Sequence, residues 1–305
     1  MRIPRKKVTY RFALTLIELL VVVGITGLLL ALILPAIMAA REASRRLHCS
    51  SNLKQIALGV TSYATACGAF PGTMLWHSPY VRILPFIDQL PLYNSINFES
   101  NVESGTLGFV SLSVFICPSD GSSWRLPAMT NYGLNGGIDD LPNAPFTCSS
   151  SFEFVSYQHI TDGSSTTAIA AEWLTGVPYE IRDARRSVFQ TDSPLIKPSE
   201  FSRFTALCRD LDTLRAPVNG IIKGHTWANP GFGTTLYNHA LLPGEHTCTN
   251  GTLALQGAWT ASSLHSGGIN TAFADCHIEF KKTSMSRRYW LAIGTMNGQE
   301  MTDGY

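Results

Sequence analysis

The longest apolar run of the chain lies near its N-terminus, from Leu14 to Ala40. Its single charged residue is Glu18, and its single proline is Pro35. In a helix, about 20 apolar residues cross the ~30 Å hydrocarbon core of a bilayer. The pattern therefore predicts a membrane-spanning helix over residues 14–40, with a carboxylate that needs a partner because charges are costly inside a membrane.

A second helical pattern follows this run directly. Its apolar positions recur at the i, i+3, i+4, i+7 spacing that predicts an amphipathic helix with one buried face. Gly68 and Pro71 favour an end of the helix near residue 67. We expect one helix from about residue 15 to 67, in which residues 41–70 continue the membrane segment. The apolar positions are Leu53, Ile56, Ala57, Val60, Tyr63, Ala64 and Cys67.

The remainder, residues 71–305, has shorter and more varied patterns, which indicate a globular head. Residues 80–93 predict short helices interrupted by prolines, and residues 114–117 and 166–173 predict strands. Residues 174–250 show weak periodicity with many prolines and glycines, so a long irregular insertion is expected there.

The C-terminal part of the head has a clearer pattern. Residues 269–274 and 277–281 alternate apolar and polar side chains around Asp275 and Cys276, which predicts a β-hairpin. Residues 286–293 predict a short helix. The expected fold class is α+β, with a long N-terminal helix leading into a mainly antiparallel, β-rich head.

The distribution of charge predicts the orientation of the membrane segment. Residues 1–13 contain five basic side chains and no acid, and such a flank keeps the N-terminus in the cytoplasm. Two simpler interpretations compete: a signal peptide cleaved near Ala39, or a plain membrane anchor. The whole chain has a net charge of only +1 with scattered basic residues, so no nucleic-acid partner is expected.

The residues around the start of the apolar run, ALTLIELL from Ala13 to Leu20, resemble the prepilin N-terminal motif of type IV pilins and type II secretion pseudopilins. The resemblance implies that a prepilin peptidase cuts between Ala13 and Leu14, that Leu14 is then N-methylated, and that Glu18 is the fifth mature residue. Ala13 and Leu14 depart from the usual Gly and Phe. Pro35 falls where many pilins also carry a proline.

This resemblance suggests a role for Glu18 in assembly. The free amine of a processed Leu14 is a cation, and Glu18 of a neighbouring subunit could neutralise it in an assembling bundle. The alternative is a carboxylate that reaches to the membrane surface without a partner subunit. Pro35 removes one helical hydrogen bond and is expected to kink or loosen the helix.

Segments of the head extend the resemblance to a large bacterial pilin-like family with an exported domain of unknown function, number 1559, described by a His-x9-Asp-Gly signature. The segments are LHCSSNLKQIALGVTSYATACGAFP, FICPSD, TDGSSTTAIAAE and LHSGGINTAFAD. His265 and Asp275 match the signature, but Cys276 stands in place of its glycine. A type I′ turn needs positive φ at both central residues, so a cysteine there is strained.

The chain contains seven cysteines, and their positions together with the family resemblance imply disulfides Cys49–Cys117 and Cys208–Cys248. An odd count leaves at least one thiol unpaired. No cysteine or histidine cluster has the sequence spacing of a zinc site, so neither a metal nor a cofactor is expected.

Enzymatic activity is not expected. His265 and Asp275 could form a base and its orienting acid, with Ser262 or Ser263 as nucleophile, but no strand-turn-helix G-x-S-x-G element surrounds these serines. Calcium ligation by the aspartates of three turns is the other possibility considered, and turn formation explains them better. They are Asp120, Asp162 and Asp275.

The resulting hypothesis is a pilin-like or pseudopilin-like structural protein of the bacterial cytoplasmic (inner) membrane. It spans the membrane once, with a cytoplasmic N-terminus and a periplasmic or otherwise extracytoplasmic head, and joins a type II secretion or type IV pilus-like structure. Its expected partners are the prepilin peptidase, membrane lipid, and other pilin-like subunits or secretion-system components. The alternative is a membrane-tethered module that binds an extracytoplasmic ligand without polymerising; a hydrolase is a more distant third.

Overall fold

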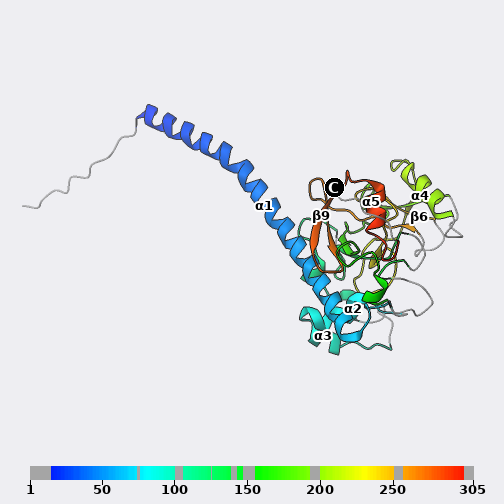
Figure 1. Ribbon diagram of the computed structural model, residues 1–305. Coiled ribbons are helices and arrows are strands. Elements are labelled where there is room, and N and C mark those ends of the chain that lie inside the picture. The colour runs from blue at the N-terminus through cyan, green and yellow to red at the C-terminus, as the bar shows by residue number, and fades with distance from the viewer. Residues whose placement is uncertain are drawn as a thin grey trace, which may run out of the picture. The chain divides into compact units, whose positions relative to one another are not determined.

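One long helix, α1 (Leu16–Cys67), begins the described part of the chain and agrees with the expected helix over 15–67 (Figure 1). At 52 residues it is about 80 Å long. The chain divides into two units, Met1–Ser44 and Arg45–Tyr305, so α1 contributes to both. The computed structural model describes residues 15–73, 76–99, 106–124, 126–138, 143–146, 155–192, 200–250 and 257–298.

The part of α1 in the first unit consists of exposed apolar side chains. Every residue of 15–41 is exposed, and the most apolar 18-residue window has a mean hydropathy of 2.8 with none of it buried. By length and composition this helix can cross a membrane. Pro35 lies inside α1, and the helix continues past it.

The part of α1 in the second unit has one buried face, as its periodicity predicts for Leu53 to Ala64, but Tyr63 is only half-buried and Cys67, which the pattern included, is exposed. The close approach of neighbouring elements is visible at Gly59, where a Cβ atom would lie 2.7 Å from the side chain of Ile87. The buried positions are Cys49, Leu53, Ile56, Ala57, Gly59, Val60 and Ala64.

A five-stranded mixed sheet forms the centre of the second unit, in the order β5-β1-β2-β8-β9. Within this sheet the β1–β5 pair is parallel, and the β1–β2, β2–β8 and β8–β9 pairs are antiparallel. The longest pairing is the β8–β9 hairpin, in which Gly268 is opposite Lys282 and Ala272 is opposite Ile278. The strands are β1 (Tyr132–Asn135), β2 (Ala168–Glu172), β5 (Leu236–Tyr237), β8 (Gly268–Phe273) and β9 (Ile278–Lys282).

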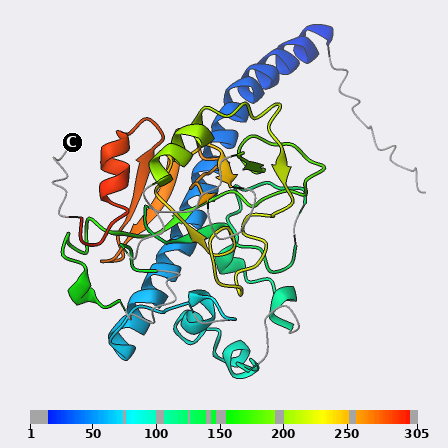
Figure 2. The same ribbon diagram turned by 90° about the vertical axis from the view of Figure 1, so that its right-hand side faces the viewer.

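Helices cover both faces of this sheet. Residues 49–64 of α1 share a core with Leu134 of β1 and Ala272 of β8, whereas α5 (Arg287–Ala292) packs on the opposite face through Trp290 against β8. Figure 2 shows strands β8 and β9, in orange, between α5 and α1. Because alternate strand residues point to opposite faces, every residue of β8 is buried. The sheet therefore holds α1 on one side and the C-terminal helix on the other.

The segment 174–250, expected to be irregular, contains a helix, three strands of a second sheet and strand β5 of the central sheet. The second sheet has the order β4-β3-β6-β7, and α4 (Phe201–Arg209) packs on it through Phe204 and the Cys208–Cys248 disulfide. Strands of two or three residues are too short to give a visible alternation, which is why periodicity missed them. These strands are β3 (Val188–Gln190), β4 (Val218–Asn219), β6 (Thr247–Thr249) and β7 (Gly257–Ala258).

Short helices fill the region between α1 and β1. Residues 80–93 form α2 (Pro79–Ile83), η1 (Leu84–Ile87) and α3 (Leu90–Asn94), in agreement with the expectation of short helices broken by prolines. The expected strand at 114–117 is wrong, because η4 (Ser113–Phe115) occupies it. The Asn52 side-chain amide of α1 donates to the carbonyls of Ser113 and Ile116. These two carbonyls therefore bond to a side chain, where a strand would bond to the backbone of a neighbouring strand. Two further short helices in the described part of the chain are η3 (Thr106–Phe109), before β1, and η5 (Tyr157–His159), after it.

The β8–β9 turn differs from the two-residue turn that the sequence suggested. The Cys276 N–H donates to the Phe273 carbonyl and the Phe273 N–H to the His277 carbonyl, so the connection has three residues. Cys276 has φ 71°, the left-handed conformation that closes a type I turn followed by a G1 bulge. Only this one position of the turn needs positive φ, and a cysteine adopts it at the site of the signature glycine.

Candidate functional site

The start of α1 contains a reciprocal hydrogen-bonded pair, Thr15 and Glu18. The Thr15 N–H and hydroxyl donate to Glu18 Oε2 at 2.9 and 2.8 Å, and the Glu18 N–H donates to Thr15 Oγ1 at 3.3 Å. This is a capping box, in which a Thr before the helix and a Glu three residues later satisfy each other's backbone donors. The T-x-x-E spacing of a capping box is present in the sequence, whereas the two roles predicted for Glu18 were pairing with a neighbouring subunit and reaching to the membrane surface.

The capping box gives Glu18 a partner within its own chain. Both hydrogen bonds from Thr15 go to Oε2, and Oε1 takes no part in the box. A carboxylate in the first turn also faces the positive end of the helix dipole. Glu18 can therefore cap its own helix and still present an oxygen outward. Ala13 and Leu14, the expected processing residues, lie outside the described part of the chain.

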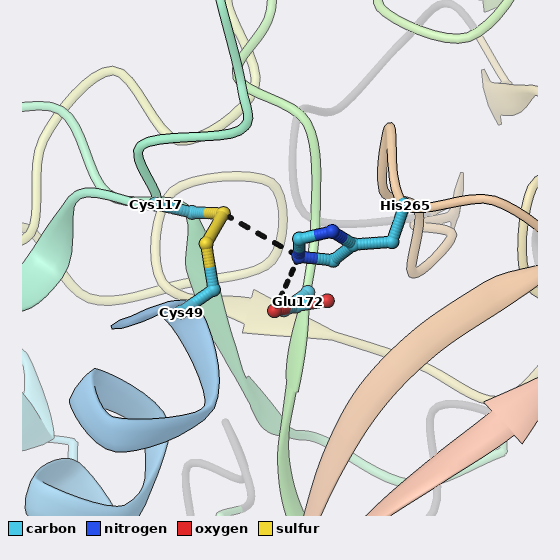
Figure 3. Close-up of side chains that lie close together, drawn as sticks. All are labelled: Cys49, Cys117, Glu172 and His265. Carbon is cyan, nitrogen blue, oxygen red and sulfur yellow. Dashed lines mark hydrogen bonds and ion pairs between the residues drawn. A yellow bond between two sulfur atoms is a disulfide. The ribbon is translucent and has the colours of Figure 1, made fainter. Parts of the chain in front are cut away.

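The second candidate site is buried in the head, where His265 faces both a carboxylate and a disulfide (Figure 3). His265 Nε2 lies 3.5 Å from Glu172 Oε1 and 3.9 Å from Cys117 Sγ, which is bonded to Cys49. The His265 and Glu172 side chains are only 1% and 2% exposed. Their pairing explains how two polar groups remain inside a core, since buried charges need partners.

Four separate segments bring these residues together. Cys49 comes from α1, Cys117 from the segment after η4, Glu172 from the end of β2, and His265 from the loop before β8. Asn270 of β8 fixes the carboxylate by donating its N–H to Oε2 at 2.9 Å and its side-chain amide to Oε1 at 2.7 Å.

His265 and Asp275, which the sequence offered as a catalytic pair that was not favoured, have different partners in the structure. Asp275 instead accepts hydrogen bonds from His277, whose Nδ1 lies 2.6 Å from Asp275 Oδ1. Desolvation is the largest single influence and raises the pKa of Asp275, but the hydrogen bonds and the electrostatic interaction with His277 together outweigh it, so the pKa is lowered. Ser262 Oγ accepts from the Leu174 N–H, and Ser263 Oγ accepts from the His265 N–H, so each serine has a structural partner.

The cysteines are paired in the combinations that the resemblance implied. Cys49 is bonded to Cys117, and Cys208 to Cys248. Among the other described cysteines, Cys67 is an exposed thiol and Cys276 a buried one. The Cys49–Cys117 bond joins α1 to the segment that follows η4, and the Cys208–Cys248 bond joins α4 to β6.

Each disulfide has a histidine beside it, an arrangement that sequence spacing did not indicate. The sulfurs of Cys49 and Cys117, a Glu172 oxygen and a His265 nitrogen all lie within 4.8 Å of one another. The second group contains three potential ligands, Cys208, His246 and Cys248.

The three aspartates weighed as calcium ligands belong to neither of these two groups, which are those found among the described residues. Asp120 instead pairs with Arg186, Asp162 accepts from the Gly298 N–H, and Asp275 pairs with His277. These contacts show three separate structural roles.

A buried charged network lies beside the central sheet. Asp120 Oδ1 is 2.5 Å from Arg186 Nη1, and Asp120 Oδ2 accepts from Thr175 and Asn131 at 2.6 and 2.8 Å. Lys223 is also fully buried and donates to Thr247 Oγ1 at 3.3 Å. Burial lowers the pKa of Lys223 to about 7, and the positive charge of Arg186 acts in the same direction.

The described part of the chain thus combines an exposed apolar N-terminal helix with an α+β head in which two disulfides are present. Residues 38–288 match the family model described as "Protein of unknown function (DUF1559)". The match covers more than half of the chain, so the chain belongs to the DUF1559 family. No curated protein matches it. No solved structure matches it either.

Proposed function

We propose that this protein is a pilin-like subunit whose helix α1 is first a single-pass membrane anchor and then the stem of an assembly. The chain would be cut by a prepilin peptidase between Ala13 and Leu14 and join a type II secretion or type IV pilus-like structure through Glu18. Family membership and the N-terminal apolar helix are compatible with an exported protein of this kind.

The observation that carries the proposal is the position of Glu18. It is an exposed carboxylate in the first turn of a helix whose residues 15–41 are all exposed apolar or small side chains apart from Thr15, Glu18, Thr26 and Arg41. A surface of this kind is covered either by lipid or by the equivalent helices of other subunits. The capping box leaves Oε1 available to the amine of a neighbouring Leu14, whose positive charge would offset the cost of burying Glu18.

The capping box also allows the two roles of Glu18 to be separated by substitution. Glutamine can replace glutamate in a capping box, so Glu18→Gln keeps the cap and removes only the charge. Thr15→Ala does the reverse, because it weakens the cap and keeps the charge. Glu18→Ala removes both.

The test compares these three variants with the wild-type chain in membranes of a host that expresses a prepilin peptidase and the assembly machinery. We expect Glu18→Gln and Glu18→Ala to reduce incorporation into sheared filaments or cross-linked oligomers at least tenfold, with membrane insertion unchanged. Thr15→Ala should assemble within about twofold of wild type. Assembly by Glu18→Gln at the wild-type level would refute the charge-pairing mechanism, and mass spectrometry of the mature N-terminus would separately show whether Leu14 is exposed and methylated.

A second candidate function, a tethered ligand-binding module, has one observation in its favour. A cavity of about 270 Å³ lies between α1, the end of η1 and the segment before η4, and its polar lining includes Asn52, Gln55, Asp88 and Gln89. Asp88 has φ 60°, a conformation that costs energy in a non-glycine residue. If Glu18→Ala leaves the function of the protein in its host unchanged while Gln55→Ala or Gln89→Ala abolishes it, the ligand-binding module is favoured over the pilin-like subunit.

A further inference from the structure

We propose that Cys49, Cys117, Glu172 and His265 form a zinc site when the Cys49–Cys117 disulfide is reduced. The site would hold Zn²⁺ through two thiolates, one imidazole nitrogen and one carboxylate oxygen. The cysteines would then have two alternative ways to tie α1 to the central sheet: a covalent bond in an oxidising compartment, and a metal in a reducing one.

The donor set fits zinc. Zinc is bound in proteins by Cys sulfur, His nitrogen and Asp or Glu oxygen, usually with four ligands in a tetrahedron. The four donor atoms here lie within 4.8 Å of one another and come from four different segments of the fold. Ligands of one tetrahedral zinc have sulfur atoms roughly 3.8 Å apart, given Zn–S bonds of about 2.3 Å. Breaking the disulfide frees both sulfurs to reach that separation by side-chain rotation.

The orientation of His265 points to a ligand rather than to packing alone. Its Nε2 is directed between Cys117 Sγ and Glu172 Oε1, as Figure 3 shows. A disulfide sulfur is a weak hydrogen-bond acceptor and does not need an imidazole nitrogen beside it. A thiolate in the same place does need a cation or a metal, because a buried negative charge is costly.

Neighbouring residues hold two of the proposed ligands in place by hydrogen bonds. Asn270 donates to both oxygens of Glu172 and fixes the carboxylate, and Tyr132 of β1 holds the Cys49 carbonyl through its hydroxyl at 3.1 Å. Hydrogen bonds of this kind orient ligands and typically change metal affinity 10–100-fold when they are removed. The group around Cys208, His246 and Cys248 has only three potential ligands, so it provides a natural comparison within the same chain.

The chemistry balances in two steps. A dithiol or phosphine reductant gives two electrons to the Cys49–Cys117 bond, and two protons from water complete two thiols while the reductant is oxidised. Zn²⁺ then replaces the two thiol protons, which pass to solvent, and binds the neutral imidazole and the carboxylate without further electron transfer. An exogenous disulfide oxidant takes two electrons from the thiolates and is reduced to two thiols with protons from solvent, which reforms the Cys49–Cys117 bond and releases the metal.

The test uses the full chain purified in detergent, before and after reduction with a phosphine that is then removed. Cobalt chloride is the probe, because tetrahedral Co²⁺ bound to thiolates has intense charge-transfer and visible absorption that a hydrogen-bonded core does not produce. We expect one Co²⁺ per reduced chain with these bands, displacement of the cobalt by Zn²⁺, and no such bands in the oxidised chain.

Matched variants locate the metal. His265→Gln should weaken cobalt binding at least tenfold, whereas His246→Gln, which alters the group at the other disulfide, should leave it unchanged. Glu172→Gln is the second variant at the proposed site and should weaken binding while far-ultraviolet circular dichroism reports the fold of each protein. Absence of thiolate–cobalt bands in the reduced wild-type chain would overturn the proposal. So would equal binding by the oxidised chain, or a loss caused by His246→Gln but not by His265→Gln or Glu172→Gln.

Discussion

Asp120 and Arg186 form a buried ion pair, with Asp120 Oδ1 2.5 Å from Arg186 Nη1 and side chains that are 1% and 9% exposed. Arg186 also donates to the carbonyls of Asp120 and Thr175. Asp120 belongs to the FICPSD segment, where the sequence suggested only a turn. Its buried contacts show that it joins this segment to the region that follows β2.

Removal of Asp120 should therefore be strongly destabilising. We expect Asp120→Ala to lower the free energy of unfolding by about 3–5 kcal/mol, because Arg186 is left buried without its counter-charge. The measurement is urea unfolding of the full chain in detergent. Arg215→Ala is the control: its ion pair with Asp212 is exposed, and its loss should change stability by less than about 1 kcal/mol. Equal effects of the two substitutions would contradict a buried role for Asp120.

The lowered pKa of Lys223 predicts that the stability of the folded chain changes with pH in the alkaline range. Its pKa is lowered by burial to about 7 in the folded chain, compared with an ordinary value of 10.5. Between these values the unfolded chain binds one more proton than the folded chain, so stability rises with pH, by at most about 1.4 kcal/mol per pH unit. Below pH 7 both states are protonated, and the cost of burying the charge is fully present.

Lys223→Met should remove this contribution. We expect the variant to be more stable than wild type at pH 7, and the difference between the two to shrink as pH rises to 9. Urea unfolding at pH 7, 8 and 9 measures the difference. A difference that stays constant with pH would mean that Lys223 is not neutralised on folding.

Cys276 allows the cost of its left-handed conformation to be measured. Its φ of 71° is unfavourable for any residue with a Cβ atom, while its sulfur lies 3.1 Å from Thr61 Oγ1 of α1. Cys276→Ala removes the thiol and keeps the strain, whereas Cys276→Gly removes both. We expect the glycine variant to be about 1 kcal/mol more stable than the alanine variant, the reverse of the usual effect of alanine. Thermal unfolding of the two variants in parallel gives this difference, and greater stability of the alanine variant would contradict it.

The Cys208–Cys248 disulfide should stabilise the second sheet specifically. It closes a sequence separation of 40 residues, which in the loop-entropy description corresponds to about 4 kcal/mol. We expect Cys208→Ala/Cys248→Ala to speed amide hydrogen exchange in α4 and β6 while exchange in β8 and β9 stays close to wild type. Uniformly faster exchange throughout the head would show instead that the two sheets unfold as one unit.

The strongest periodic patterns of the sequence were sufficient to predict the elements that they encode. The continuous helix α1, its buried face from Leu53 to Ala64, and the β8–β9 hairpin all follow from spacing that repeats over several turns or residue pairs. The T-x-x-E cap at Thr15 and Glu18 was equally local and was available to the same reasoning. Such features depend on neighbours in the sequence, so sequence alone determines them.

Contacts between distant segments were decided only by the tertiary structure. The helix at Ser113–Phe115 stands in place of an expected strand, with Asn52 of α1 donating to the Ser113 and Ile116 carbonyls, and the short strands β3, β4, β6 and β7 exist because they pair with one another. His265 likewise meets Glu172 and the Cys49–Cys117 disulfide, although Asp275 is much closer to it in sequence. The chemistry of a buried site depends on which side chains the packed sheet brings together, and the distance between two side chains in the fold cannot be inferred from their spacing in the sequence.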